Sequence, residues 1–176
     1  LAILLSTSGT TGSPKLVRLS YQNIQSNAES IVSYLSITPE ERAITTLPLH
    51  YSYGLSVLHS HLCAGACLLC TESSLVNREF WTMFKEQTCT SIAGVPFTYQ
   101  MLRRLRFESM ETPSLRTMTQ AGGGLDLKQI RFFGEIARSK SMRFFVMYGQ
   151  TEASPRISYV PWEKLSEKMG SIGISV

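Results

Sequence analysis

Apolar residues occur along this chain in two patterns that alternate. Short runs rich in apolar and β-branched residues, of the kind found in buried strands, lie at 1–5, 16–19, 43–47, 66–71, 90–93, 115–119 and 143–147. Between most of these runs, apolar residues recur at the spacing of one helix face, at 20–35, 53–62, 77–87, 96–105 and 127–139. The alternation predicts an α/β fold, in which a mostly parallel sheet is covered by helices.

Local signals support several of these elements. The run at 16–19 follows the first run closely, and we expect these two strands to pair antiparallel. Ser20 is a favourable N-cap for the next helix, and Pro96 suits the first turn of a later one. The helix at 20–35 should bury one face, formed by Ile24, Ala28, Ile31 and Leu35.

Composition describes an ordinary globular protein. With 176 residues, 43% of them hydrophobic and 17% charged, the chain is long enough for one domain with a sizeable core. The net charge of +4 suits anionic ligands. The basic cluster Arg103, Arg104 and Arg106 indicates a solvated helix face rather than a nucleic-acid interface. No apolar stretch is long enough to span a membrane, and we expect a cytoplasmic protein.

The spacing of three cysteines suggests the hypothesis of an iron–sulfur cluster site. Cys63, Cys67 and Cys70 follow the Cys-x3-Cys-x2-Cys pattern of radical S-adenosylmethionine enzymes, whose thiolates hold an iron–sulfur cluster. They lie, however, where a helix should end and an apolar strand begin, and free cysteine is common in cores. We therefore expect them to pack in a helix end and a buried strand. Cys89 has no evident disulfide partner.

A polar segment after the first strand is the most informative motif. It reads Thr7-Ser8-Gly9-Thr10-Thr11-Gly12-Ser13-Pro14-Lys15. The backbone N–H groups of such a segment can surround an oxyanion, while hydroxyls and a lysine add donors and positive charge. It departs from the Walker pattern, because Pro14 precedes the lysine and Leu16 follows it. On composition alone a plain turn is the alternative, but the whole string favours a polyphosphate-binding loop.

Two further polar segments follow predicted strands. The glycine triplet at 122–124 comes after the run at 115–119, and 148–152 comes after the run at 143–147. In open α/β sheets, ligands bind beyond the carboxyl ends of the strands. We therefore expect these two segments and the phosphate loop to converge on one edge of the sheet and to form a nucleotide site there.

The same segments resemble the motifs of one family. The loop at 7–15 is similar to the phosphate loop of the adenylate-forming (ANL) superfamily, which includes acyl-CoA synthetases, firefly luciferase and the adenylation domains of nonribosomal peptide synthetases. The segment 148–152 resembles that family's Tyr-Gly-x-Thr-Glu motif, 121–125 its adenine-binding turn and 170–173 its Gly-Ser-x-Gly stretch. Because four matches keep the family's order across essentially the whole chain, the chain is identified as a member.

The resemblance implies a reaction and its cofactors. Members attach a carboxylic acid to the α-phosphate of ATP, with Mg²⁺, and release pyrophosphate. They then transfer the acyl group to a thiol such as CoA or the phosphopantetheine of a carrier protein. Since an anion must approach a polyanion, such chemistry needs hydrogen-bond donors and a metal more than a protein nucleophile. The partners expected are therefore ATP, a small carboxylic acid and possible carrier proteins, and no nucleic acid.

The resemblance also implies roles for individual residues. Thr151 would contact the α-phosphate, Glu152 would help to ligate Mg²⁺, and Tyr148, beside Gly149, would stack on adenine. The β- and γ-phosphates would be held in the loop by Ser8, Gly9, Thr10, Thr11, Gly12 and Lys15, with Thr7 at the rim, and the adenine would lie against Gly122 and Gly123. Taken singly, Tyr148 also suits a core position and Glu152 a helix start.

The acid-binding side of the resemblance is less uniform. Members carry a histidine in Pro-Leu-Phe-His-x-x-Gly, whereas this chain reads Pro-Leu-His-Tyr-Ser-Tyr-Gly at 48–54. Equal-length alignment puts Tyr51 at that place, and either His50 or Tyr51 could line the carboxylate site. His59 and His61, in an apolar helix, indicate a structural role. The segment 94–97 resembles the Val-Pro-Pro region of the acyl pocket, with Phe97 replacing the second proline.

Members continue with a ribose-gripping Thr-Gly-Asp segment and a small C-terminal domain with a catalytic lysine, both absent from 1–176. The resemblance therefore implies that 1–176 is a single fragment of the AMP-binding (adenylation) domain, the large N-terminal domain. We expect such a fragment to bind nucleotide partially and to be inactive alone. The alternatives from other classes are a noncatalytic nucleotide-binding module and a phosphate-loop NTPase that releases ADP.

Overall fold

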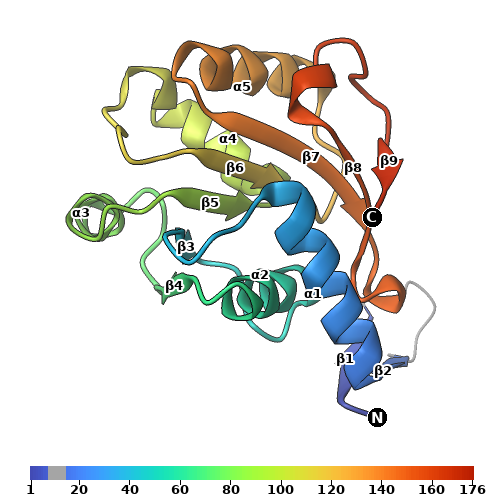
Figure 1. Cartoon of the computed structure of the whole chain (residues 1–176). Helices are drawn as coiled ribbons and strands as arrows, with labels where there is room; N and C mark the ends of the chain where they lie inside the picture. The colour runs from blue at the N-terminus through green and yellow to red at the C-terminus, as the bar shows by residue number, and fades with distance from the viewer. Residues whose placement is uncertain (8–14) are drawn as a thin grey trace.

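The computed structural model describes residues 1–7 and 15–176. A seven-stranded sheet forms its centre, in the order β4-β3-β5-β6-β7-β8-β9 (Figure 1). The pairs from β4 to β7 are parallel, and β8 and β9 add antiparallel pairs at the other edge. The strands are β3 (Arg42–Thr45), β4 (Cys67–Cys70), β5 (Ser91–Gly94), β6 (Thr117–Gln120), β7 (Arg143–Gly149), β8 (Arg156–Val160) and β9 (Ile174–Ser175). The predicted mostly parallel α/β sheet is confirmed.

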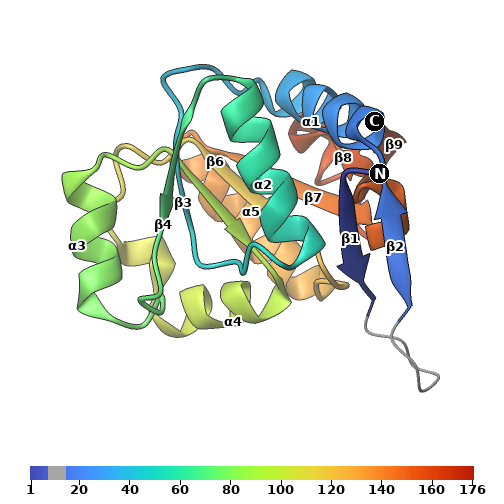
Figure 2. The same ribbon diagram turned by 90° about the horizontal axis from the view of Figure 1, so that it is seen from below.

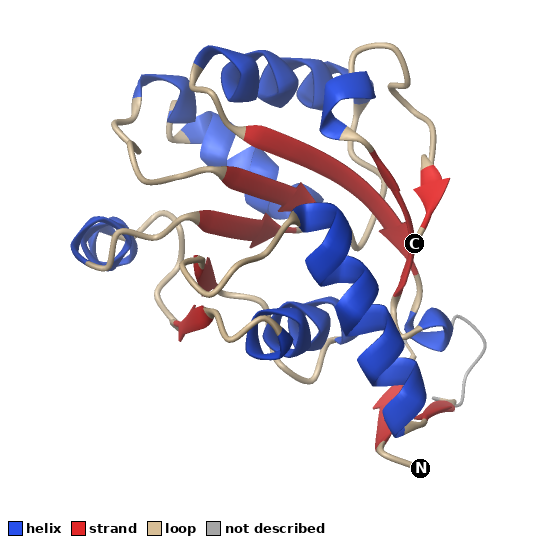
Figure 3. Cartoon of the chain, viewed as in Figure 1, coloured by secondary structure: helices blue, strands red, loops and turns tan. Residues whose placement is uncertain are grey.

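Helices cover both faces of this sheet (Figures 2 and 3). α1 and α2 lie over one face, and α4 and α5 lie over the other, with α3 beside the β4 edge (Figure 2). The helices are α1 (Tyr21–Leu35), α2 (Ser52–Cys63), α3 (Arg78–Glu86), α4 (Pro96–Arg104) and α5 (Leu127–Ser139). None of the helices in the described part of the chain is both long and apolar enough to cross a membrane.

The helix ends follow their sequence signals. The Ser20 hydroxyl accepts a hydrogen bond from the Asn23 backbone N–H at 3.1 Å, and the Asn23 side chain accepts one from the Ser20 N–H at 3.0 Å. This reciprocal cap starts α1 at the expected place. Pro96 occupies the first turn of α4, and the Asp126 carboxylate accepts a hydrogen bond from Lys128 N–H at 2.6 Å to begin α5.

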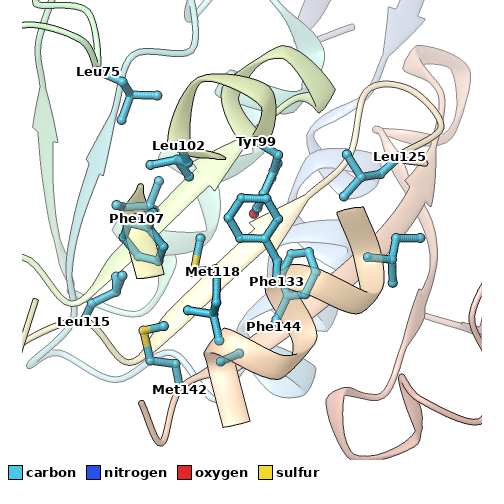
Figure 4. Close-up of a cluster of buried hydrophobic side chains, with 14 of the residues drawn as sticks. Leu75, Tyr99, Leu102, Phe107, Leu115, Met118, Leu125, Phe133, Met142 and Phe144 are labelled. Carbon is cyan, nitrogen blue, oxygen red and sulfur yellow. The ribbon is translucent and has the colours of Figure 1, made fainter. Parts of the chain in front are cut away.

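The larger hydrophobic core lies between the sheet and α3, α4 and α5. Its centre contains Tyr99, Phe133, Phe144 and Met118, all essentially inaccessible to solvent (Figure 4). Tyr99 and Phe133 meet edge to face with ring centroids 4.9 Å apart. Close packing here holds β6 and β7 against α4 and α5, and so fixes the ends of the strands from which the loops described below emerge.

A second core lies under α1 and α2. Ile31 and Leu35 of α1 and Val57 of α2 pack with Phe145 and Met147 of β7. Ile24 is partly buried, whereas Ala28, Ile31 and Leu35 are buried as the helix face predicts. α1 and α2 also pack side by side. Because α2 is held on both sides, its N-terminal end is fixed near the carboxyl ends of the central strands.

Two features of the sheet differ from the sequence expectation. The run at 66–71 was expected to be a buried strand, but β4 is an edge strand whose four residues are exposed or half-buried. Its apolar side chains are covered from fewer directions than the pattern implies. In addition, β8 and β9 extend the sheet beyond β7, where no strand was expected. The reason lies in β8, where the polar residues Arg156 and Ser158 point to the buried side.

A small hairpin stands apart from the main sheet. β1 (Ile3–Ser6) and β2 (Leu16–Leu19) pair antiparallel, with Ser6 opposite Leu16, as the sequence predicts. The Thr7 N–H continues the pairing by donating to the Lys15 carbonyl at 3.1 Å. The hairpin therefore brings Thr7 and Lys15 together at its end, on either side of residues 8–14.

Candidate functional site

A cleft of about 430 Å³ opens beyond the carboxyl ends of β6 and β7. One wall is the turn after β6, at 121–125, and another is the end of β7 with the segment that follows it. The first turn of α2 and the stretch Gly170, Ser171 and Ile172 complete the lining. Segments from four distant parts of the sequence thus meet in one concave site, at the sheet edge where α/β proteins bind ligands.

The glycine turn and Tyr51 form one side of this cleft. Gly122 has φ +77° and Gly123 has φ +154°, which L side chains rarely adopt. A Cβ built on Gly122 would collide with the Tyr51 hydroxyl. On Gly123 it would stand 3.2 Å from Pro96 Cγ. The turn therefore exposes bare backbone to the cleft and packs against Tyr51 and the start of α4.

Of the two candidates at the acid-binding position, the structure brings Tyr51 into the cleft. Tyr51 lines it, whereas His50 is exposed and is not part of the lining. Tyr51 is the N-cap residue of α2, and its ring meets that of Tyr53 edge to face at 6.4 Å. Phe97, from the segment expected to border an acyl pocket, is 64% exposed and lies outside the lining.

Gln120 holds the glycine turn from below. Its side chain is 1% exposed, and its amide nitrogen donates to the Gly123 carbonyl at 2.8 Å and to the Ala121 carbonyl at 3.3 Å. A buried amide with two backbone acceptors fixes a turn that has no secondary structure of its own. Sequence reasoning missed this residue. A glutamine two positions before a glycine triplet gives no sign in the sequence that its side chain is buried.

The short helix η2 (Thr151–Ala153) supplies the opposite side of the cleft. The Thr151 hydroxyl donates to the Ser52 hydroxyl at 3.2 Å, which links η2 to the first turn of α2 across 99 positions of sequence. Glu152 is exposed and takes part in no ion pair among the described residues. Thr151 is therefore fixed in place, while the Glu152 carboxylate faces solvent and can accept a cation.

Tyr148 and Gly149 end β7 at the mouth of the cleft. Tyr148 is 44% exposed and lines the site, so its ring offers a face to a planar ligand. A Cβ on Gly149 would collide with the Pro155 carbonyl, because β7 and β8 approach closely at an irregular register there. The Gln150 N–H donates to that same carbonyl at 2.8 Å. Only a glycine fits at position 149, because the backbone of Pro155 packs directly against it, next to Tyr148.

The predicted phosphate loop joins the two strands of the hairpin in sequence. Ser8, Gly9, Thr10, Thr11 and Gly12 lie outside the described residues. Thr7 and Lys15, which flank them, are held together in the hairpin, with the Thr7 hydroxyl 3.5 Å from the Lys15 carbonyl. β2 packs beside η2, as Figure 1 also shows. The two strand ends therefore lie on the side of the molecule that carries Thr151 and Glu152.

The floor of the cleft is polar and buried. Tyr53 lies there with its hydroxyl 2.9 Å from the Thr119 hydroxyl and donating to the Thr119 carbonyl at 3.1 Å, and burial raises its pKa to about 12. The guanidinium of Arg156 lies 5.0 Å from the centroid of the Tyr53 ring. Tyr53, Met147 and Arg156 line both the cleft and a smaller cavity beneath it. Sequence reasoning did not single out Arg156.

The hypothesis of an iron–sulfur cluster site finds no support in the described part of the chain. Residues 1–7 and 15–176 contain no group of His, Cys, Asp or Glu side chains arranged to hold a metal. Cys63 and Cys70 are exposed free thiols and Cys89 is buried. His61 is buried, with Nδ1 2.7 Å from the Val57 carbonyl, and burial lowers its pKa. Its burial and its contact within α2 fit the structural role predicted for it.

Comparison with known proteins decides the family. The model of the AMP-binding enzyme family matches residues 1–176. The chain belongs to this family. Its resemblance to the adenylate-forming superfamily is thereby confirmed over the whole sequence.

Curated AMP-binding enzymes similar to this chain are ligases that form CoA esters. The chain is 32% identical over 173 residues to 2-succinylbenzoate–CoA ligase of Bacillus subtilis, covering 98% of this chain and 34% of that protein. It is 27% identical over 175 residues to feruloyl-CoA synthase of an Amycolatopsis species, with the same coverage of both chains. The chain thus spans about a third of the length of these relatives.

Solved AMP-binding enzymes share the fold. The chain superposes on o-succinylbenzoate CoA synthetase from Bacillus subtilis, in complex with its acyl-adenylate intermediate, with a TM-score of 0.85 at 29% identity. This covers 98% of this chain and 34% of that one. The N-terminal domain of a protein from Mycobacterium tuberculosis aligns with a TM-score of 0.86 at 22% identity, and this similarity concerns the fold. The α/β architecture is therefore that of the family's N-terminal domain.

Proposed function

We propose that this chain is the nucleotide- and acid-binding part of an adenylate-forming ligase. In the reaction, a carboxylate oxygen of the acid attacks the α-phosphorus of ATP. The bond from that phosphorus to the bridging oxygen breaks, and the electron pair leaves with pyrophosphate. The thiol of CoA or of a carrier-protein phosphopantetheine then attacks the carbonyl carbon of the acyl-adenylate and gives up its proton. The bond from that carbon to the phosphate oxygen breaks, AMP leaves, and the acyl group becomes a thioester.

The observation that carries this proposal is the meeting of the glycine turn, Tyr148 and Thr151 in one cleft. Bare backbone at Gly122 and Gly123 on one wall and the exposed Tyr148 ring at the mouth would hold the adenine. Thr151, anchored by Ser52, would contact the α-phosphate. The segment between Thr7 and Lys15 would hold the outer phosphates, with Lys15 balancing their charge.

The residues at the site fit a bound Mg²⁺. Glu152 offers an exposed carboxylate, directly next to Thr151, and Mg²⁺ in nucleotide sites is held by one or two carboxylates together with phosphate oxygens and water. When bound, the ion would neutralise charge on the phosphates and on departing pyrophosphate. A structure of the Bacillus subtilis o-succinylbenzoate synthetase contains ATP and a magnesium ion, which supports the same requirement here.

Tyr51 would bind or orient the acid. Its hydroxyl faces the glycine turn and lies in the cleft that holds Thr151. A phenol is neutral near pH 7 and can donate to a carboxylate without adding a charge. His50, exposed and outside the cleft lining, is assigned no contact with the acid.

Two other functions would use the same cleft. A noncatalytic module would bind the nucleotide without chemistry, and a phosphate-loop NTPase would release ADP. The loop sequence argues against the second, because Pro14 and Leu16 interrupt the Walker pattern. We further propose that residues 1–176 alone bind nucleotide weakly and turn over no substrate, since the chain spans about a third of its relatives.

The test is acid-dependent exchange of labelled pyrophosphate into ATP by the intact protein that carries this chain. A panel of carboxylic acids should give exchange with at least one acid, with AMP as the nucleotide product when a thiol is added. Thr151→Ala should lower exchange by about tenfold to a hundredfold, whereas the exposed helical control Thr82→Ala should not. Robust release of ADP, or nucleotide binding without exchange for any acid, would overturn the proposal.

A further inference from the structure

The side chain of Arg156 is buried, and its hydrogen-bond acceptors within this protein are weak or neutral. Its side chain is 4% exposed, at the start of β8. Its guanidinium donates to the Met147 thioether at 2.7 Å and to the Ser56 hydroxyl at 3.3 Å, and lies over the Tyr53 ring. A thioether is a poor acceptor and a hydroxyl is neutral. The two hydrogen bonds therefore leave the positive charge without a formal counter-charge.

No carboxylate of this chain supplies that counter-charge. Lys164–Glu167 is the one ion pair in the described residues, and residues 8–14 contain no acidic side chain. Arginine keeps its proton at any physiological pH, and a buried charge that is not paired is costly. The Asn27 side chain bonds both the N–H and the carbonyl of Arg156, at 3.2 and 2.9 Å. The residue is thus held in a position that an anion would stabilise.

One carboxylate, Glu41, lines the same small cavity, at its other end. Glu41 precedes β3, at the amino ends of the parallel strands, and its carboxylate accepts a hydrogen bond from the Thr90 hydroxyl. Arg156 pairs with Gly149 at the carboxyl end of β7. The length of a four-residue strand, about 13 Å, separates these ends. Glu41 therefore neither pairs with Arg156 nor repels an anion at the Arg156 end.

The distance from Arg156 to the reacting end of the site follows from α2. Ser52, which anchors Thr151, and Ser56, which accepts from Arg156, are four residues apart on this helix. They lie on one face and about 6 Å apart along the axis. A short dicarboxylate spans about this distance between its two carboxyl groups. The cavity beneath the cleft, about 30 Å³, has room for a small polar end group and not for a long alkyl chain.

We propose that Arg156 determines substrate specificity by binding a second carboxylate on the acid, and that the acid activated here is a short aliphatic dicarboxylate. One carboxylate reacts beside Thr151, and the other forms charge-assisted hydrogen bonds with Arg156. Tyr53 and Met147 are shared between the cleft and the inner cavity, and they form the passage between the two ends. This inference rests on the proposed ligase function.

The experiment compares matched acids in pyrophosphate exchange by the intact protein. Succinate is compared with butyrate, and glutarate is compared with valerate. Each pair has the same chain length, and the second acid of each pair lacks the second carboxylate. We expect the dicarboxylates to be preferred by about a hundredfold in kcat/KM, because a site built for a polar group rejects the analogue without it. This comparison uses the wild-type protein and needs no variant.

Variants then assign the preference to the guanidinium. Arg156→Met should lower kcat/KM for the dicarboxylates by about a hundredfold and change that for the monocarboxylates by less than about fivefold, and Arg156→Lys should restore part of the loss. The control is Arg103→Met, since Arg103 is exposed and also lies 5.0 Å from an aromatic centroid, that of Phe132. A purely structural role would lower both classes of acid equally.

The outcomes separate the two proposals. Exchange with both classes at similar rates, or exchange with monocarboxylates alone, would overturn the role of Arg156 and leave the ligase function standing. An equal loss for both classes in Arg156→Met would also overturn it. Exchange with none of a broad panel of acids would overturn the ligase function itself. Dicarboxylate preference that is lost in Arg156→Met and partly restored in Arg156→Lys would establish the inference.

Discussion

The hydroxyl of Tyr51 lies against the Cα of Gly122, so closely that no β-carbon fits between them. Tyr51 ends the loop before α2, and Gly122 follows β6, so this contact joins the acid side of the cleft to its glycine wall. The contact depends on the absence of a side chain at a position with φ +77°. It therefore gives a direct test of how the cleft is built.

Gly122→Ala should damage the cleft in two ways. The left-handed backbone costs an L-residue about 1–2 kcal/mol, and the new methyl group would push the Tyr51 ring from its position. We expect the free energy of unfolding to fall by about that amount and the KM for ATP or acid to rise in pyrophosphate exchange. Gly124→Ala is the matched control, because no atom lies within 4 Å of its built Cβ. Equal effects of the two substitutions would contradict this account.

The Ser52–Thr151 hydrogen bond predicts a second effect. Ser52 is buried and its hydroxyl accepts from Thr151 at 3.2 Å, so Ser52→Ala should leave Thr151 free to change rotamer. We expect pyrophosphate exchange to fall by about threefold to tenfold, near the 1 kcal/mol typical of one neutral hydrogen bond. In a double-mutant cycle, Ser52→Ala should have no further effect in the Thr151→Ala background. Additive losses would contradict the coupling.

The carboxylate of Glu152 should affect pyrophosphate exchange through the binding of Mg²⁺. Glu152→Gln keeps the shape of the side chain but weakens it as a ligand for Mg²⁺. We therefore expect a higher Mg²⁺ concentration for half-maximal exchange, by about tenfold, with exchange recovering at high Mg²⁺. Glu86→Gln, an exposed residue at the end of α3, is the control and should leave the Mg²⁺ dependence unchanged. A Glu152→Gln curve superposed on wild type would exclude Glu152 as a ligand.

Much of the fold was predictable because its elements carry strong local signals. The helix predicted at 127–139 forms at those residues as α5, since its apolar spacing is regular. β8 was missed because Arg156 and Ser158 occupy the buried positions of its alternation, so the pattern of apolar residues is reversed there. β4 was expected to be buried because its sequence is apolar. An apolar run does not reveal whether a strand lies at the centre or at the edge of a sheet.

The residues of the candidate site likewise include some that the sequence could predict and some that it could not. Gly122, Tyr148 and Thr151 could be expected to meet, because loops after parallel strands gather at one edge. Gln120, Ser52 and Arg156 could not, since each is a single polar residue whose importance depends on burial. Their partners lie far away in the sequence, as in the hydrogen bond between Arg156 and Ser56 across 100 positions. Sequence motifs thus pointed to residues expected to contact a ligand, and the structure added polar residues that stand out only once their burial and partners are known.

The cysteines should differ sharply in reactivity. Cys63 and Cys70 are exposed, whereas burial raises the pKa of the Cys89 thiol to about 11, so little thiolate forms there at neutral pH. We expect a maleimide to label Cys63 and Cys70 rapidly in the native protein and Cys89 only after unfolding, as measured by peptide mass spectrometry. Fast labelling of Cys89 without denaturant would show that its surroundings open readily.

Stability should depend on the protonation of His61. Burial, as the larger effect, lowers the pKa of this histidine below 6.5, although the Val57 carbonyl and Glu41 act in the opposite direction. The unfolded chain therefore binds a proton first as the pH falls through about 6.5, and stability decreases in that range, by at most about 1.4 kcal/mol per pH unit. Above that pH both states are neutral at His61 and its contribution is constant.

Urea unfolding at pH 7.5 and pH 5.5 measures this effect. The asparagine in His61→Asn can still donate to the Val57 carbonyl but binds no proton, so this variant should lose less stability between the two pH values than wild type. His50→Asn is the control, since His50 is exposed. This variant should lose as much stability between the two pH values as the wild-type protein does. Parallel losses in wild type and His61→Asn would mean that His61 is protonated as easily in the folded protein as in the unfolded chain, and that its burial beside Val57 imposes no cost on the charged form.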